Sequence, residues 1–238
     1  MSLRKYIPDF LTAMNLVCGL IALVLAFGGR PDIAFCLMLA AAVFDFSDGF
    51  AARALHAYSD MGKELDSLCD LVSFGVLPAV LMHLQMKSAG IQDWSCWLPL
   101  LIAVFSALRL AKFNVDERQR ASFIGLPTPA CAMICAALCH YVHMNPSGLL
   151  AAWASGPVFI PLLSVCLCAL LVCGIPMFSM KFHADDGRAL KMKRLVFLLL
   201  SLLAALSCPV FGLTWSMAVL LVFVVYVLMN VISAIFRV

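Results

Sequence analysis

Residues 45–70 read DFSDGFAARALHAYSDMGKELDSLCD, and six of the chain's 13 acidic residues fall within this stretch. A helix turns by about 100° per residue, so the acids of the first half share one face with small residues and an arginine. That face comprises Asp45, Asp48, Gly49, Ala52 and Arg53. On a second helix, one face comprises Gly62, Asp66, Asp70 and Ser73. Two helices joined by a short polar loop would therefore point four carboxylates at one another.

Carboxylates gathered in this way predict a metal site. Four like charges at contact distance cannot all stay ionised without a strong cation, and hard oxygen ligands suit Mg²⁺, Mn²⁺ or Ca²⁺. Gly49 and Gly62 remove side chains where a bulky ligand would approach the backbone. The alternative is a solvated acidic loop between two membrane helices, which leaves the glycines and the one-sided placement of the acids unexplained.

The composition predicts an all-α polytopic membrane helix bundle. Apolar residues make up 64% of the 238 positions and charged residues 12%, against about 45–50% and 25% in soluble domains. We expect about eight transmembrane helices in a single integral membrane domain, residues 1–238, because spans of ~20 residues use most of the chain. The expected spans are about 10–27, 33–55, 66–86, 96–113, 127–145, 157–178, 194–208 and 214–236.

Basic residues predict the orientation. With eight spans, one side of the membrane holds 14 of the 16 Lys and Arg residues, and the other side holds only Arg30 and Lys87. Because basic loops stay on the cytoplasmic side, both termini and the carboxylates are expected there, in a multi-pass protein of the cell (inner) membrane. Arg4 and Lys5 precede an apolar run, as in a signal peptide, but no convincing small-residue cleavage site follows, so we expect the first span to be retained. The net charge of +3 then reflects basic loops near anionic headgroups, not a nucleic-acid surface.

The same topology places the acids below the membrane surface. Residues 33–44 form an apolar run about 18 Å long as a helix, so Asp45 lies roughly 10 Å short of the cytoplasmic edge of a ~30 Å hydrocarbon core. Residues 71–86 span about 24 Å, which puts Asp70 slightly shallower. The acids are therefore expected to line a cavity open to the cytoplasm, and ionisable groups at this depth mark functional sites.

The fixed spacing in residues 45–70, D-x2-D-G-x2-A-R-x8-G-x3-D-x3-D, resembles the signature of the CDP-alcohol phosphotransferases. Members of that family move a phosphatidyl or similar group from a CDP-linked donor to an alcohol within the membrane. The resemblance implies a six-helix catalytic core over residues about 1–178, with two further helices within 194–236. Those two helices carry almost no polar groups, so we expect them to serve packing or oligomer contacts.

The resemblance also assigns roles to the residues of the signature. It implies that two divalent ions, Mg²⁺ or Mn²⁺, bridge the donor's diphosphate and neutralise the charge growing on the leaving CMP. Their ligands would be Asp45, Asp48, Asp66 and Asp70. Asp70 would also take the proton from the acceptor hydroxyl as a general base. The donor contacts would include Gly49, Ala52, Arg53, Ser59 and Gly62.

The first span begins IPDFLTAMNLVCG at residue 7, which is similar to the IPN-x2-T-x2-N-L-x2-G start of family members for phosphatidylserine synthesis. Asp9 replaces the asparagine, while Thr12 and Asn15 match. Thr12 and Asn15 lie one helical turn apart, and we expect them to contact polar groups of the donor. Hydrogen bonds between helices are the alternative role.

The fourth span ends SALRLAKFNVDERQRASFIGLPTPA, residues 106–130, with a segment that resembles R-L-A-R-F-N … F-x-G-L-P-x-P-A of bacterial phosphatidylserine synthases. Arg109 and Lys112, which stands where arginine is usual, suit a phosphate or the carboxylate of serine. Asn114 is assigned to the same serine site. Alternatively, both cations extend to lipid headgroups. The run from Gly125 to Pro129 breaks regular helix, and it either places a turn beside the site or only starts the fifth span.

The resemblance therefore implies transfer of the phosphatidyl group from CDP-diacylglycerol to L-serine. We also expect membrane lipids as partners, and a homodimer. The acceptor could instead be glycerol 3-phosphate or inositol, because the acidic signature is shared by the enzymes for all these alcohols. A divalent-cation transporter also places acids in membrane helices, but usually near the midplane and across related repeats. No repeat is evident in this chain, and no nucleic-acid partner is expected.

Overall fold

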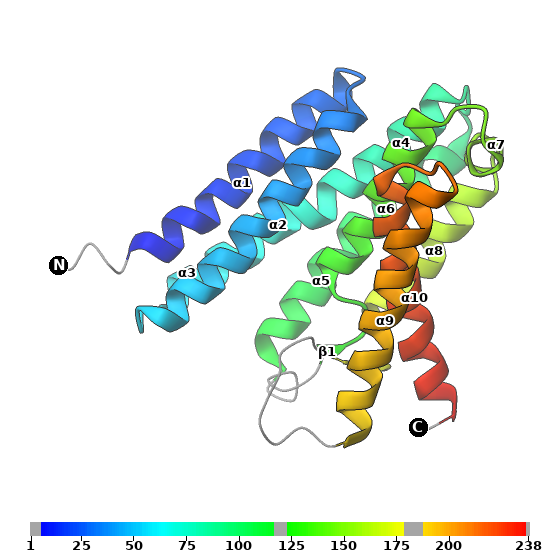
Figure 1. The fold of residues 1–238 in the computed structure, drawn as a ribbon. Coiled ribbons are helices and arrows are strands. Elements are labelled where there is room, and N and C mark those ends of the chain that lie inside the picture. The colour runs from blue at the N-terminus through cyan, green and yellow to red at the C-terminus, as the bar shows by residue number, and fades with distance from the viewer. Residues whose placement is uncertain (1–5, 117–122, 179–187, 237–238) are drawn as a thin grey trace.

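The structure is a computed structural model, and it describes residues 6–116, 123–178 and 188–236 (Figure 1). The elements of its first half are α1 (Tyr6–Phe27), α2 (Pro31–Ala54), α3 (Asp60–Asp70), the π-helix η2 (Leu71–Val76), α4 (Leu77–Ser88), the 3-10 helix η3 (Trp94–Leu100) and α5 (Leu101–Val115). The elements of its second half are β1 (Phe123–Ile124), α6 (Thr128–Met144), α7 (Leu149–Ala154), α8 (Phe159–Val172), β2 (Pro176–Met177), α9 (Arg188–Val210) and α10 (Trp215–Phe236).

In the described part of the chain, six helical stretches are long and apolar enough to cross a membrane. They cover Tyr6–Phe27, Pro31–Ala54, Asp60–Ser88, Trp94–Val115, Leu190–Val210 and Trp215–Phe236. The expected all-α polytopic membrane bundle is thereby confirmed. Two of the eight expected spans are shorter than predicted, because α6 has 17 residues and α8 has 14.

The third membrane helix begins before its apolar run. It starts at Asp60 rather than near residue 66, because Ser59 Oγ accepts a hydrogen bond from the backbone N–H of Gly62 at 2.9 Å and caps the helix. At 1.5 Å per residue, Asp45 lies about 14 Å from the end of α2 and Asp70 about 15 Å from the start of α3. Both acidic faces therefore lie well inside their helices.

The boundaries of the sixth and seventh spans also differ from the prediction. α8 ends at Val172 rather than near residue 178, because Cys173 has an extended backbone. α9 begins at Arg188 rather than near 194 and continues to Val210. Its first turns are rich in Lys and Arg, so a search for apolar runs does not detect that they are helical.

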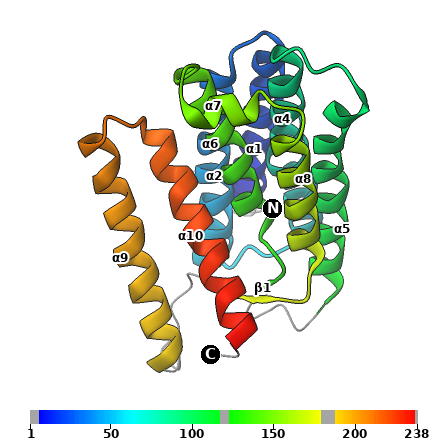
Figure 2. The same ribbon diagram turned by 90° about the vertical axis from the view of Figure 1, so that its right-hand side faces the viewer.

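α6 lies at the centre of the bundle, with α10 in front of it in Figure 2. Residues 130–142 are all buried, and the helix packs against α2, α4 and α10. A helix that is apolar on every side is normally buried in this way. Alanine and cysteine dominate this segment, and such small side chains let neighbouring helices approach closely.

α1 and α2 run side by side along one edge of the bundle (Figure 1), and α1 also contacts α3 and η2. Where α1 crosses η2, a Cβ on Gly19 would overlap the hydroxyl of Ser73. Ser73 Oγ donates a hydrogen bond to the backbone oxygen of Asn15 at 3.1 Å. η2 begins directly after Asp70, and such π turns inside helices frequently occur at functional sites.

The turn that begins at Gly125 joins a short strand pair to α6. β1 and β2 pair antiparallel, with Phe123 opposite Met177. Gly125 has a φ of 80°, its N–H donates to the backbone oxygen of Ile175 at 2.9 Å, and a Cβ there would lie 2.6 Å from the backbone oxygen of Leu171. The strand pair lies at the end of the bundle where α9 begins and α10 ends (Figure 2).

Candidate functional site

Three of the four predicted carboxylates meet between α2 and α3. Asp45 and Asp48 lie one turn apart on α2, and Asp66 lies on α3. One oxygen of each lies within 4.8 Å of the others. Asp48 is buried, and the other two are half-buried. These three residues, called the carboxylate cluster below, show that the two acidic faces meet as the spacing predicts.

Asp70 lies one turn beyond Asp66 and outside the carboxylate cluster. Its side chain is 8% exposed, and its Oδ1 accepts a hydrogen bond from Asn15 Nδ2 at 3.1 Å. Asp70 still lies near enough to the cluster for their charges to interact. Asp70 is thus a carboxyl group beside the cluster of three, and a residue of α1 orients it.

A second residue of α1 contacts the cluster directly. Thr12 Oγ1 donates to Asp48 Oδ2 at 2.5 Å, and the backbone oxygen of Pro8 is an alternative acceptor at 3.0 Å. Thr12 and Asn15 are both buried. Both therefore make hydrogen bonds between helices, which was the alternative role expected for them, and both bonds go to carboxylates of the signature.

A pocket of about 170 Å³ lies beside the cluster. The predicted site residues that line it are Thr12, Asp48, Gly49, Ala52, Ser59, Gly62 and Asp66. Asn15 and Arg53, which were also predicted donor contacts, are not among the lining residues. The pocket therefore joins α1, α2 and α3 around two members of the carboxylate cluster.

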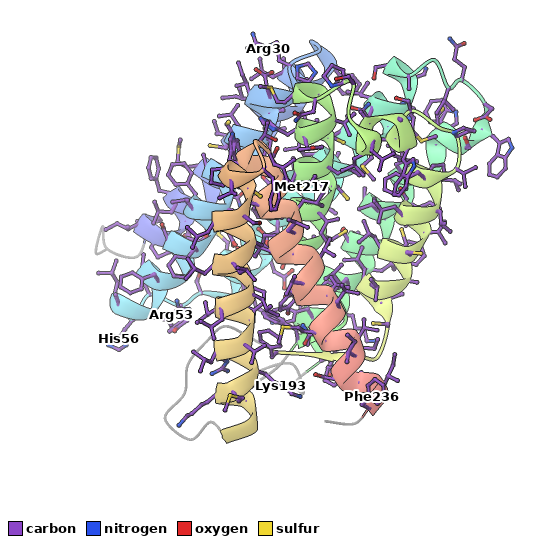
Figure 3. The ribbon with its side chains drawn as sticks, turned by 45° about the vertical axis from the view of Figure 1, so that its right-hand side comes forward. Arg30, Arg53, His56, Lys193, Met217 and Phe236 are labelled. Carbon is purple, nitrogen blue, oxygen red and sulfur yellow. The ribbon has the colours of Figure 1, made fainter. Side chains whose placement is uncertain are left out.

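Gly62 keeps this pocket open. A Cβ at this position would lie 2.9 Å from both Asp9 Oδ1 and Ser59 Oγ, which is too close for either to stay in place. At Gly49 a Cβ would meet only Arg53 Nη1, at 3.6 Å. Arg53 is exposed near the end of α2 (Figure 3).

Several lining residues were not assigned to the site from the sequence. Asp9 departs from the family pattern and had no expected role, and neither had Pro8 or Ala57, although all three line the pocket. Tyr58 and Lys63 also line the pocket. Tyr58 lies in the short connection between α2 and α3, and Lys63 follows Gly62 in the first turn of α3. Both belong to residues 45–70, and this position beside the acidic faces was the signal for them.

Arg109 is a buried cation with an unused hydrogen-bonding edge. It is 6% exposed, and its Nη1 donates to Thr128 Oγ1 at 3.2 Å. Nε and Nη2 are buried and have no hydrogen-bond partner among the described residues. The rings of Phe113 and Phe123 lie 5.3 and 5.6 Å from the guanidinium carbon, and Asp70 is near enough for their charges to interact.

The other two predicted acceptor residues do not join Arg109. Lys112 is exposed, although it lies only one turn away on α5. Asn114 Nδ2 donates to Ser67 Oγ at 2.9 Å, and its backbone oxygen accepts from Lys63 Nζ at 2.9 Å. Asn114 therefore links α5 to α3 beside the pocket, and of the three predicted acceptor residues Arg109 is the one that supplies a buried positive charge.

The carboxylate cluster suits a divalent metal. Asp66 Oδ1 is buried and has no hydrogen-bond partner in the described part of the chain. An unpartnered buried carboxylate oxygen is costly, and a hard cation that takes oxygen ligands would compensate for it. The donor set therefore fits the Mg²⁺ or Mn²⁺ expected from the sequence.

Comparison with known proteins agrees with this geometry. Residues 5–163 match the family profile described as CDP-alcohol phosphatidyltransferase. Three similar relatives carry the name CDP-diacylglycerol–serine O-phosphatidyltransferase. The one from Mycobacterium tuberculosis is 37% identical over 187 residues, 76% of this chain and 63% of its own length. The one from Bacillus subtilis is 37% identical over 129 residues, 54% and 72% of the two chains, and the one from Methanocaldococcus jannaschii is 32% identical over 195 residues, 75% and 90%.

The chain thus spans less than two thirds of the mycobacterial relative but nine tenths of the Methanocaldococcus one. The matched residues include the carboxylate cluster, Asp70 and Arg109, while α9 and α10 lie beyond them. The profile covers well over half of the sequence. The chain therefore belongs to the CDP-alcohol phosphatidyltransferase family.

Proposed function

We propose that this protein transfers the phosphatidyl group of CDP-diacylglycerol to the hydroxyl of L-serine and releases CMP. Family membership supports the reaction class, and the names of the relatives support these two substrates. The choice of serine rests on one observation: Nε and Nη2 of the buried Arg109 guanidinium have no hydrogen-bond partner among the described residues. Free serine has a carboxylate, which simple neutral alcohols lack.

The geometry of Arg109 suits such a carboxylate. Nε and Nη2 form one edge of the planar guanidinium, and two parallel N–H groups match the two oxygens of a carboxylate. A buried cation without a partner is destabilising. An anionic acceptor that pairs with Arg109 would therefore gain more binding free energy than it would from an exposed arginine. α5, which carries Arg109, packs against η2, which begins directly after Asp70. The bound acceptor would therefore place its hydroxyl on the side of that carboxyl group.

The donor would lie beside the carboxylate cluster, on the side of Asp70 opposite the bound serine. Metal ions held by Asp45, Asp48 and Asp66 would neutralise the diphosphate and the departing CMP. The pocket lined by Thr12, Gly49 and Ala52 would hold the nucleotide part of the donor. The acyl chains would remain in the surrounding bilayer.

Asp70 would act as the general base. Its Oδ1 is held by Asn15, so the carboxyl group is oriented before the acceptor arrives. Asp70 takes the proton of the serine hydroxyl, and the serine oxygen forms a bond to the β-phosphorus of the donor. The bond from that phosphorus to the bridging oxygen breaks, and CMP leaves with that oxygen. Asp70 was also expected as a fourth metal ligand, and that role stays a prediction beside the role of base.

The proposed location is the inner membrane, with both termini and the site facing the cytoplasm. Arg53 and Lys193 lie towards one end of the bundle and Arg30 at the opposite end (Figure 3), which agrees with the predicted division of basic residues. Six residues counted for the cytoplasmic side lie outside the described residues: Arg4, Lys5, Arg118, Arg120, Lys181 and Arg237. We also propose that the protein is a homodimer. Its molecular mass in detergent solution, corrected for bound detergent, tests this.

A panel of acceptors tests the proposed function. Purified protein is incubated with CDP-diacylglycerol, Mg²⁺ or Mn²⁺, and labelled serine, glycerol 3-phosphate or inositol, and both lipid products and CMP are measured. We expect serine to be consumed in proportion to the CMP released. Exclusive use of glycerol 3-phosphate would mean that Arg109 binds a phosphate. Cation transport in liposomes without any lipid product would favour the transporter instead.

A further inference from the structure

α10 lies outside the residues that match the family profile, yet two of its buried side chains bond to Phe178, the residue after β2. β2 pairs with β1, and Phe123 of β1 contacts Arg109. We propose that Tyr226 and Asn230 are positioning residues which, through the β1–β2 pair, hold Arg109 in the orientation that binds the acceptor. The inference rests on the proposed role of Arg109 in acceptor binding. It gives α10 a function beyond the packing or oligomer contacts expected from its sequence.

The first link joins α10 to the residue after β2. Tyr226 Oη donates to the backbone oxygen of Phe178 at 3.0 Å, and the backbone N–H of Phe178 donates to Asn230 Oδ1 at 2.9 Å. Asn230 Nδ2 in turn donates to the backbone oxygen of Tyr226 at 2.8 Å. The rings of Phe178 and Tyr226 meet edge to face, with centroids 5.1 Å apart. Both backbone groups of Phe178 are thus held by α10.

The second link joins β2 to the turn before α6. Met177, which directly precedes Phe178, pairs with Phe123 of β1. The N–H of Gly125 donates to the backbone oxygen of Ile175, two residues before Met177. Because the two strands are only two residues long each, they have little stability of their own. The end of α8 also holds the turn after β1, because the N–H of Leu126 donates to the backbone oxygen of Leu170 at 2.8 Å. The position of β1 therefore depends in part on what holds β2 from outside, and α10 does that through Phe178.

The third link joins β1 to Arg109. The ring of Phe123 lies 5.6 Å from the guanidinium carbon, and Thr128, at the end of the same turn, accepts the Nη1 hydrogen bond. An arginine side chain has several rotatable bonds, so ordering it on each binding event would weaken binding. Phe123 and Thr128 hold the Arg109 side chain before the acceptor binds, so Nε and Nη2 already point in the orientation that binding requires.

These links predict a selective effect on the acceptor. Neither Tyr226 nor Asn230 lines the pocket beside the carboxylate cluster. We therefore expect the KM for CDP-diacylglycerol to stay unchanged when either residue is replaced. A loosened β1 would instead let Arg109 adopt other rotamers, and the KM for the acceptor would rise.

Two variants and one matched control test the inference. Asn230→Leu removes the acceptor for the Phe178 N–H at similar volume, and Tyr226→Phe removes only a hydroxyl. Ser216→Ala is the control, because Ser216 is also buried on α10 and its Oγ lies 2.9 Å from Thr214 Oγ1, near the opposite end of the helix. Thermal unfolding in detergent first establishes that each variant is folded, and kcat and KM are then measured for both substrates.

The loss of one hydrogen bond changes an equilibrium constant by up to about a factor of ten. If that bond holds Arg109 in its binding orientation, the serine KM should rise by up to about tenfold in Asn230→Leu and somewhat less in Tyr226→Phe. The KM for CDP-diacylglycerol should stay within about twofold in both, as should all constants of Ser216→Ala. An unchanged serine KM in both folded variants, or an equal rise in the donor KM, would overturn the inference.

A double variant shows whether the effect passes through Arg109. Asn230→Leu combined with Arg109→Gln should have the serine KM of Arg109→Gln alone, because the positioning contact then has nothing left to position. Additive effects on KM would contradict the proposal. If the wild-type protein uses another alcohol in place of serine, the proposed function fails, and the same cycle is measured with that alcohol: coupling to Arg109 supports the positioning role and additivity refutes it.

Discussion

Arg109→Gln removes a charge from a buried position while it keeps a polar side chain there. The guanidinium is 6% exposed, so solvent and salt screen it little. A hydrogen bond between charged partners contributes roughly 1.5–3 kcal/mol, and about 1.4 kcal/mol corresponds to a factor of ten in binding. The serine KM should therefore rise about 10- to 100-fold. Since Nε and Nη2 are both available, we expect a value in the upper part of that range.

The assay measures phosphatidylserine formed from labelled serine at saturating CDP-diacylglycerol, and then the donor dependence at saturating serine. Lys112→Gln is the matched control, because Lys112 lies one turn away on the same helix but is exposed. Exposed charge pairs contribute little, so the control should change the serine KM by less than about threefold.

Two results would refute this reasoning. A raised donor KM with an unchanged serine KM in Arg109→Gln would assign the guanidinium to the donor site. An equal effect of Lys112→Gln would show that general attraction of anions to this end of the bundle, and not the buried edge of Arg109, sets the affinity.

The carboxylates and the topology lead to three further predictions. Chelation of metal by EDTA should abolish turnover but leave the helical content unchanged, because apolar packing holds the bundle; activity that survives exhaustive chelation would exclude a metal role. Asp70→Asn should lower kcat by about 10²- to 10⁴-fold without rescue by excess metal, whereas Asp48→Asn should be partly rescued by high Mg²⁺ or Mn²⁺; equal rescue would make Asp70 only a ligand. Cysteines placed at Lys63 and Lys87 should be labelled from opposite sides of the membrane, and labelling from the same side would disprove the orientation.

It was predictable from the sequence that the acids would meet, because α2 and α3 are regular α-helices over the residues that carry them. Asp45 and Asp48 on α2, and Asp66 on α3, obey the 100° spacing, so their faces could be assigned without coordinates. The helical turn between Thr12 and Asn15 was predictable for the same reason. The spacing does not reveal that these two residues bond to the carboxylates, since either role needs the same face of α1.

The course of the chain beyond Asp70 was less predictable. η2 interrupts the regular phase of the helix, and no residue in its sequence requires a π turn. Arg109 is buried beside Phe123 and Thr128, whereas Lys112, one turn away, is exposed, and the sequence pattern does not show which side of α5 these contacts cover. The contacts of Tyr226 and Asn230 join residues about 50 positions apart, and such tertiary contacts leave no periodic pattern in the sequence.

Isotopic labelling of the acceptor tests the central claim, that the hydroxyl of serine attacks the donor phosphorus. Serine labelled with ¹⁸O in its hydroxyl is incubated with CDP-diacylglycerol, and both products are analysed by mass spectrometry. We predict that all of the label is retained in phosphatidylserine and that the CMP carries none. Labelled CMP, or a lipid product without the label, would contradict the claim.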